Sequence, residues 1–261
     1  MKQEIVLQTE NLSIGYNHKK QQNVVSYNIN IALQKGQLIS LIGGNGAGKS
    51  TLLRTITGIQ KPIAGDVNLK GKKISDFDTL ALSQQLSIVL TEKLPPGDLT
   101  VFELIALGRQ PYTNWIGTLT ELDHVKISEA MHLAEVTHLS DKKHYEISDG
   151  QLQKVLIARA LAQDTPLILL DEPTTHLDLL HKVSLFRLLK KLTESGKCIL
   201  FSTHDIDLAI SFSDEMILMK SGIVIQGTPL KLISNGALKN LFEDENITFD
   251  EQKGKFIYKL L

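Results

Sequence analysis

A loop rich in small residues between positions 43 and 48 is the first group that could do chemistry. The stretch matches the pattern G-x-x-x-x-G-K-[ST], ends in Lys49 and Ser50, and stands between the apolar run LISLI and a segment with helical spacing. Small residues let a backbone wrap around phosphate oxygens, and the following helix adds its positive dipole end. The pattern predicts a phosphate-binding loop in which Lys49 bridges the β- and γ-phosphates and Ser50 binds Mg²⁺. The residues predicted to contact the nucleotide here are Gly43, Gly44, Asn45, Gly46, Ala47, Gly48, Lys49, Ser50 and Thr51.

Two adjacent carboxylates, Asp171 and Glu172, follow a second apolar run, LILL. This places them at the carboxyl end of a predicted strand, where open α/β sheets bind their ligands. Asp171 is predicted to hold the hydrated Mg²⁺, and Glu172 to polarise a water for in-line attack on the γ-phosphate. An acidic turn would be the alternative for the pair taken alone, and the phosphate loop upstream favours the catalytic interpretation.

A third motif, SDGQ, begins at Ser148 and precedes a helical pattern. Ser148 and Gln151 form an S-x-x-Q capping box, which is a structural role. The Ser148 hydroxyl, the Gly150 backbone and the helix N-terminus could also bind an anion. Because the chain's own phosphate loop surrounds one side of a nucleotide, we expect a second copy of the chain to use this motif on the other side.

The segments that must position these groups alternate between strand and helix patterns. Up to residue 71 the chain predicts a helix after Lys49 and strands at 4–16, 23–33, 37–43 and 65–71. Between 100 and 165 apolar residues recur three and four apart, which predicts helices. The remainder alternates again, with strands at 167–172, 198–204, 215–221 and 222–227 and helices that include 179–189 and 206–212. Such alternation predicts a parallel sheet covered by helices, with the helical block inserted between the sheet's halves.

Composition narrows the class of protein. The 261 residues are 42% hydrophobic and 22% charged with a net charge of −1, which is ordinary for a globular chain and gives no electrostatic footprint for nucleic acid. No run approaches a membrane span, and the N-terminus lacks the apolar core of a signal peptide, so we expect a cytosolic chain. The single cysteine, Cys198, lies in an apolar run and is expected to be a buried thiol rather than a reactive one.

The phosphate loop, SDGQ, LILLDE, THLD at 175–178 and STHD at 202–205, in this order, resemble the ATP-binding cassette of ABC transporters across nearly the whole chain. The resemblance implies an α/β fold: a P-loop NTPase cassette with a RecA-like mixed sheet core, an N-terminal antiparallel β subdomain and an inserted helical subdomain. It implies one ABC domain over about 5–230. The expected parts are 1–90 (antiparallel β subdomain and phosphate loop), 91–165 (helical subdomain with SDGQ), 166–227 (rest of the core) and 228–261 (a helix and an edge strand).

The resemblance also implies roles for individual residues. Tyr16 would stack on the adenine, and His204 would contact the γ-phosphate and position the attacking water. Asp178 would lie in the loop that crosses a dimer interface. The residues that would reach the ATP of the partner chain are Ser148, Gly150 and Gln151. Taken singly, Tyr16 is more typical of a half-buried strand aromatic, and His204 of a solvated polar residue.

Two positions depart from the family pattern. The family usually has a glutamine before the helical subdomain, where this chain offers Thr91 or Glu92. Glu92 could offer an oxygen to the metal, which keeps turnover possible. Asp149 replaces a glycine, and because a carboxylate would repel the γ-phosphate, we expect Asp149 to face away from it.

The stretch PGDLTVFELIALGRQPYTNWIG at 96–117 is similar to ATPases of importers for ferric siderophores, haem and cobalamin. That resemblance implies an ATPase at the cytoplasmic face of the membrane that works with two integral-membrane permease subunits and, indirectly, a substrate-binding protein. Alternatively, Arg109, Pro111 and Tyr112 only shape the subdomain. The alternative function is a soluble ATP-gated clamp on a ribosome or DNA, which the single cassette and the lack of a basic patch disfavour. A phosphotransferase is a third, more distant possibility, because no acceptor pocket or lid is recognisable.

Overall fold

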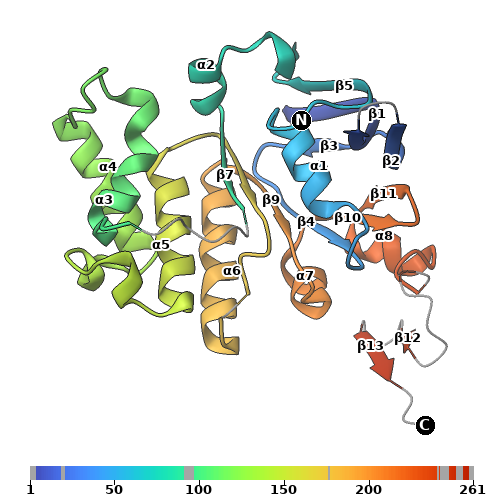
Figure 1. Cartoon of the computed structure of the whole chain (residues 1–261). Coiled ribbons are helices and arrows are strands. Elements are labelled where there is room, and N and C mark those ends of the chain that lie inside the picture. The colour runs from blue at the N-terminus through green and yellow to red at the C-terminus, as the bar shows by residue number, and fades with distance from the viewer. Residues whose placement is uncertain are drawn as a thin grey trace.

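The computed structural model of this chain describes residues 4–18, 21–90, 97–175, 177–239, 241, 247–250 and 255–258. Within them, a six-stranded sheet with the order β11-β10-β4-β9-β8-β7 forms the centre (Figure 1). Neighbouring strands are parallel except β10 and β11, so the sheet is mixed as expected. The strands are β4 (Leu38–Gly43), β7 (Leu86–Val89), β8 (Leu167–Leu170), β9 (Cys198–Ser202), β10 (Glu215–Lys220) and β11 (Ile223–Gly227). Strands β4, β8 and β9 are buried along their whole length, because helices and a second sheet cover both faces.

The second sheet is antiparallel and comes from the first part of the chain. Its order is β2-β1-β5-β6, with β3 also paired to β1. The strands are β1 (Ile5–His18), β2 (Gln21–Ile29), β3 (Ala32–Gln34), β5 (Ala64–Leu69) and β6 (Lys72–Lys73). Its apolar face packs with helix α1 (Lys49–Ile56) and the central sheet in one core cluster, which includes Leu7, Leu41 and Leu53. This packing holds the start of α1 against the end of β4.

One predicted strand of this sheet is wrong. The apolar pattern at 23–33 predicts a single strand, but the chain makes two, β2 and β3, which pair with different halves of β1. Asn28 adopts the left-handed conformation at the end of β2 (φ 53). The Asn30 side chain then donates to Asn28 O at 3.0 Å and accepts from Asn11 N at 2.9 Å. These contacts turn the chain between the two strands.

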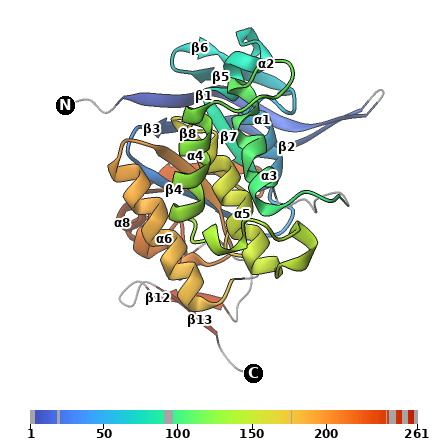
Figure 2. The same ribbon diagram turned by 90° about the vertical axis from the view of Figure 1, so that its left-hand side faces the viewer.

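A helical block lies between β7 and β8 in the sequence, and Figure 1 shows it on the left of the sheet. Its helices are α3 (Val101–Ala106), α4 (Glu121–Leu133) and α5 (Asp149–Ala162), with short 3-10 helices at Leu107–Tyr112, Thr137–Leu139 and His144–Glu146. The helices share their own apolar core, which includes Ile105, Ile127 and Val155. Figure 2, viewed from this side, shows the N-terminal sheet above these helices.

Arg109 belongs to the interior of this block. Its guanidinium is buried, donates to Asp123 Oδ1 at 2.7 Å and to Ala162 O at 2.8 Å, and lies 4.0 Å from the centre of the Tyr112 ring. Burial raises the pKa of Asp123, but hydrogen bonds from Thr120 and Arg109 outweigh this effect and hold that pKa below its usual range. Arg109 therefore shapes the helical block, which favours the structural alternative given for this stretch.

Further helices lie along the two sheets. They are α2 (Thr79–Ser83), a 3-10 helix at Ile74–Asp76, α6 (Leu179–Glu194), α7 (Ile206–Phe212) and α8 (Pro229–Ser234). Helices α5 and α6 bury an apolar cluster against β8 and β9, in which Phe186 contacts Phe201 edge to face. None of the helices in the described ranges has the length and apolar character needed to cross a bilayer.

The C-terminal part differs from the expectation of one edge strand. Strands β12 (Ile247–Asp250) and β13 (Lys255–Tyr258) pair with each other in antiparallel fashion and do not join the edge of the central sheet in the described residues. The rings of Phe249 and Phe256 lie 5.0 Å apart and pack into a cluster with Leu232 of α8. The two strands thus cover each other's backbone groups.

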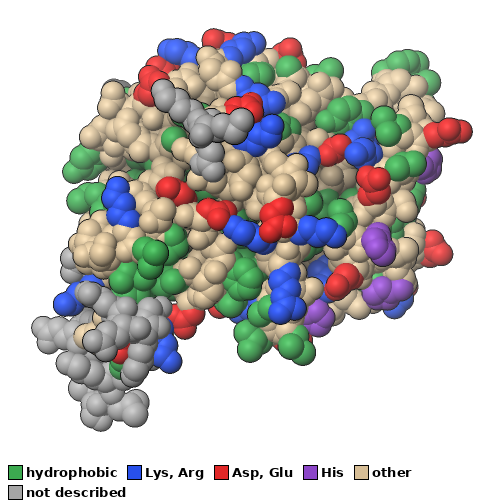
Figure 3. Space-filling view, turned by 180° about the vertical axis from the view of Figure 1, so that it is seen from behind, with side chains coloured by type: hydrophobic (Ala, Val, Ile, Leu, Met, Phe, Trp, Pro, Cys, Tyr) green, Lys and Arg blue, Asp and Glu red, His purple; other side chains and the backbone are tan. Residues whose placement is uncertain are grey.

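Charges of both signs are mixed on the rear face. Figure 3 shows Lys and Arg side chains interspersed with Asp and Glu side chains there, outside the grey atoms. The part of this face that the structure describes therefore carries no continuous basic surface, in line with the net charge of −1.

Candidate active site

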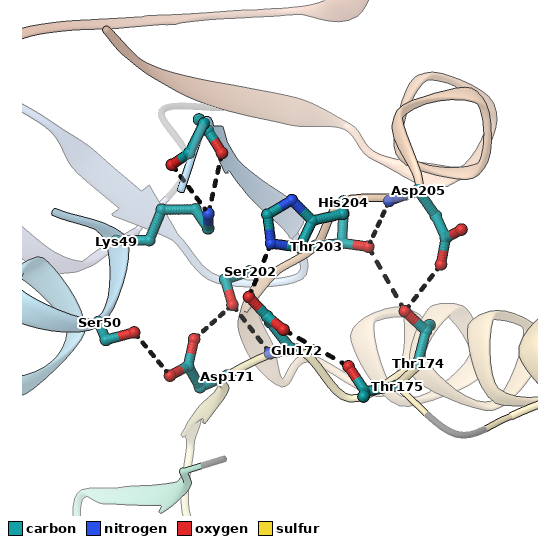
Figure 4. A network of polar contacts seen from close by, with 12 residues as sticks. Lys49, Ser50, Asp171, Glu172, Thr174, Thr175, Ser202, Thr203, His204 and Asp205 are labelled. Atoms are coloured by element: carbon teal, nitrogen blue, oxygen red, sulfur yellow. Dashed lines mark hydrogen bonds and ion pairs between the residues drawn. The ribbon is translucent and has the colours of Figure 1, made fainter. Parts of the chain in front are cut away.

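The loop at 43–48 joins the end of β4 to the start of α1, and two of its glycines are sterically required. Gly48 has φ 102, and a Cβ there would lie 2.5 Å from Val25 Cγ1. A Cβ on Gly43 would lie 2.6 Å from Met219 O. Lys49 Nζ donates to Gly43 O at 2.8 Å and to Gly44 O at 3.4 Å. These bonds tie the Lys49 ammonium to the first residues of the loop (Figure 4). Burial lowers the pKa of Lys49, and the carboxylates of Glu172 and Asp171 oppose this effect.

Asp171 lies directly beyond β8 and meets side chains from two other elements. Ser50 Oγ, at the start of α1, donates to Asp171 Oδ2 at 2.9 Å, and Ser202 Oγ, at the end of β9, donates to Asp171 Oδ1 at 2.5 Å (Figure 4). Asp171 is buried. The parallel register of β8 and β9 brings these groups together, because the carboxyl ends of both strands lie at one edge of the sheet.

Ser202 is a site residue that the sequence analysis did not select. Its hydroxyl also accepts the Glu172 N–H at 2.8 Å, so one side chain orders both carboxylate residues. The sequence feature that could have identified Ser202 is its place in STHD, where a polar residue ends the apolar run of β9. Val25 also lines the pocket beside the loop. No sequence feature could have identified it, since its residue type and spacing are those of an ordinary strand residue.

Glu172, which follows strand β8, contacts His204, which follows strand β9. His204 Nε2 is 2.9 Å from Glu172 Oε1 (Figure 4). Glu172 has φ 48, a left-handed conformation that residues other than glycine seldom adopt and that clusters at functional sites. The bond from its N–H to Ser202 helps hold this conformation.

A pocket of about 430 Å³ opens above the loop. Its lining residues are Tyr16, Val25, Asn45, Gly46, Ala47, Gly48, Lys49, Ser50, Thr51 and Glu172. Tyr16 is 45% exposed and its hydroxyl lies 2.8 Å from Thr51 Oγ1, which fixes an aromatic ring at the pocket rim. The pocket is within the size range of small-ligand sites.

The SDGQ motif forms the predicted capping box at the start of α5. Gln151 N donates to Ser148 Oγ at 3.3 Å, and Ser148 N donates to Gln151 Oε1 at 3.0 Å. With Gly150 and Asp178, these residues line a separate hollow of about 610 Å³, and none of them lines the phosphate-loop pocket as described. Ser148, Asp149 and Asp178 are exposed. One chain thus carries two separate groups of predicted site residues.

Asp178 begins helix α6 and caps it. Its carboxylate accepts from His181 N at 2.9 Å and lies 2.9 Å from His181 Nδ1. Thr91 and Glu92 lie outside the described residues, so the metal contact expected of Glu92 stays a prediction.

The sequence also matches a known family model. Residues 27–175 match the model of the ABC transporter family. The chain belongs to this family. The resemblance and the fold class expected from the motifs are therefore confirmed, and the chain is the ATP-hydrolysing component that ABC transporters use to drive transport.

Relatives in the ABC transporter family are similar over almost their full length. An uncharacterized ABC transporter ATP-binding protein of Methanocaldococcus jannaschii is 42% identical over 97% of this chain and 87% of that protein. The iron(3+)-hydroxamate import ATP-binding protein FhuC of Bacillus subtilis is 39% identical over 95% of this chain and 92% of that protein.

Solved ABC structures have the same fold. A metal-chelate type ABC transporter in an inward-facing conformation matches with a TM-score of 0.78 and 28% identity over 97% of this chain and 95% of that chain. A dimeric ATP-binding cassette in a post-hydrolysis state, bound to ADP and phosphate, matches with a TM-score of 0.75 and 31% identity over 85% of this chain and 98% of that chain.

Proposed function

We propose that this ABC subunit hydrolyses ATP at the phosphate-loop pocket and thereby powers uptake of an iron chelate. The observation that carries the proposal is the contact of Glu172 with His204 beside the loop that holds Lys49. A carboxylate and an imidazole in contact at the edge of a phosphate pocket can orient and polarise a water for attack.

ATP fits the pocket by chemistry and size. The backbone N–H groups of the loop and Lys49 would receive the phosphates, and Tyr16 would stack on the adenine from the rim. The donor set of Ser50 and Asp171 is a hydroxyl and a buried carboxylate, both hard oxygen ligands of the kind that Mg²⁺ takes. When bound, Mg²⁺ would neutralise the charge that develops on the β- and γ-phosphates. Glu172 would then orient the attacking water, with His204 beside it.

A complete site would need two copies of the chain. Ser148, Gly150, Gln151 and Asp178 lie apart from the phosphate loop of their own chain. An exposed helix N-terminus with a serine hydroxyl can receive the γ-phosphate of a nucleotide on another chain. The matching cassette structure is dimeric, which supports a homodimer closed around two ATP molecules.

The relatives support a proposal for the cargo and for the membrane partners. The relative FhuC is named for import of iron(3+)-hydroxamate, and the solved neighbour is a metal-chelate type transporter. An iron chelate is therefore the proposed cargo, ahead of haem or cobalamin. We place the subunit at the cytoplasmic face of the membrane, bound to two permease subunits that receive cargo from a substrate-binding protein.

Sedimentation of the Glu172→Gln variant tests the site directly. Because this change removes the proposed water-orienting carboxylate and keeps the phosphate loop, we expect ATP with Mg²⁺ to convert the variant from monomer to dimer without turnover. Adding Ser148→Arg should abolish the dimer. Full ATP hydrolysis by Glu172→Gln would exclude Glu172 as the group that activates water, and a dimer that survives Ser148→Arg would exclude the composite site.

Transport is tested in cells that depend on this subunit for iron. Uptake of radioactive ferric hydroxamate should stop in the Glu172→Gln strain, while a strain with the unaltered chain takes it up. Loss of cobalamin uptake with intact ferric hydroxamate uptake would contradict the proposed cargo.

A further inference from the structure

Asp205 occupies the N-cap position, directly before helix α7 (Ile206–Phe212), but its side chain does not cap the helix. Aspartate at this position usually accepts a hydrogen bond from the backbone of the first turn. Within the described residues, the Asp205 side chain makes no such bond to α7 (Ile206–Phe212). Its carboxylate instead accepts from Thr174 Oγ1 at 2.9 Å and pairs with Lys182 Nζ at 3.0 Å. The carboxylate is thus turned away from its own helix toward α6.

These contacts hold the chain on both sides of His204. Asp205 N donates to Thr203 Oγ1 at 3.0 Å, and Thr174 Oγ1 lies 3.5 Å from the same Thr203 oxygen (Figure 4). Thr174 and Thr203 are buried, so the contact between these two hydroxyls is shielded from water. His204 lies between Thr203 and Asp205 and points at Glu172.

Lys182 connects the network to the start of α6. Its backbone N–H donates to Asp178 O at 2.9 Å, in the turn that Asp178 caps. Its ammonium and the Asp205 carboxylate are 24% and 33% exposed, so their attraction is less screened than that of a fully exposed pair. Asp178 is thus joined to Lys182 by a backbone hydrogen bond, Lys182 to Asp205 by an ion pair, and Asp205 to His204 by the peptide bond between them.

We propose that the contact of Lys182 and Thr174 with Asp205, here named the α6 brace, positions His204 against Glu172. The brace also links His204 to Asp178 of the same chain. Asp178 is one of the residues proposed to face the second copy of the chain. Binding of the second copy near Asp178 would thus affect the position of His204. This inference rests on the proposed function. The three residues of the brace, Thr174, Lys182 and Asp205, are positioning residues and are not proposed to touch the nucleotide.

Steady-state ATP hydrolysis by Lys182→Met tests the brace. Methionine keeps the apolar stem and removes the ammonium, so kcat should fall roughly tenfold because His204 is less well placed, while KM for ATP stays within about twofold. Lys182→Arg keeps the charge and should retain most of kcat. The matched control is Lys190→Met, which breaks a similarly exposed ion pair of α6 with Asp214 (2.5 Å) and should hydrolyse ATP like the unaltered chain.

A double variant asks whether the brace acts through His204. In a His204→Ala background, Lys182→Met should cause no further loss of kcat, since the group that it positions is gone. Equal losses in both backgrounds would overturn the brace, as would an equal loss in Lys190→Met. If the unaltered chain hydrolyses no ATP, the proposed function is overturned; if it does and Lys182→Met has the unaltered kcat, only the brace is overturned.

Discussion

The hydroxyl of Ser202 lies 2.5 Å from Asp171 Oδ1 and donates to it. The Ser202 oxygen also accepts a hydrogen bond from the backbone N–H of Glu172, a residue in a left-handed conformation. A serine at the end of β9 thus bonds both acidic residues at the end of the neighbouring strand β8, through the carboxylate of Asp171 and the backbone N–H of Glu172. It connects the residue proposed for Mg²⁺ to the residue proposed for water activation.

Ser202→Ala should lower both stability and turnover. The change leaves the Glu172 N–H and one Asp171 oxygen without this partner, which costs about 1–3 kcal/mol of unfolding free energy for a buried polar group. Thermal unfolding and ATP hydrolysis at varied Mg²⁺ would measure the effect, with Ser211→Ala, a change at an exposed serine of α7, as the control. A variant with unaltered stability and unaltered turnover would remove Ser202 from the site.

Gly48→Ala should disable the phosphate loop. The residue has φ 102, which costs a residue with a Cβ about 1–2 kcal/mol, and the added methyl would collide with Val25. We expect a clear loss of ATP affinity in isothermal titration calorimetry. Gly227→Ala is a suitable control, because its Cβ would meet only ordinary contacts. ATP affinity equal to that of the unaltered chain would contradict this prediction.

Asp123→Asn should destabilise the helical block. It leaves the buried Arg109 guanidinium without its charge partner, and breaking such a pair costs about 3 kcal/mol. Chemical denaturation of the variant at neutral pH gives the difference in unfolding free energy. A loss below about 1 kcal/mol would show that Ala162 O and the Tyr112 ring suffice to hold Arg109.

The same pair predicts a pH dependence. Because the pKa of Asp123 is lower in the folded chain than in the unfolded chain, its carboxylate stabilises the fold above the unfolded value of about 4, and this stabilisation is lost as pH falls through the folded value. Unfolding free energy should therefore fall more steeply between about pH 5 and pH 3 in the unaltered chain than in Asp123→Asn. Parallel pH profiles for the two chains would contradict it.

Cys198 should be inert in the folded protein. The thiol is buried in β9, and burial raises its pKa to about 12, so very little thiolate forms near neutral pH. A thiol reagent at pH 8 should label the chain only after denaturant is added. Because this is the only cysteine in the sequence, labelling of the native chain at the unfolded rate would directly contradict the prediction.

Local patterns determined much of this protein. The phosphate loop, the capping box of Ser148 and Gln151, and the apolar runs of β4, β8 and β9 depend on neighbouring residues, so their residue types and spacing predict them. These features sufficed to predict the family and the fold class.

Contacts between distant residues were decided only by the tertiary structure. Ser202 meets Asp171, Arg109 meets Asp123, and Asp205 turns from its own helix to Lys182 because packed strands and helices bring these groups together. The apolar pattern at 23–33 could not show the break between β2 and β3, since Asn30 makes it by bonding to Asn11 of another strand. A pattern along the chain carries local preferences, whereas partners far apart in sequence are selected by the packing of whole elements.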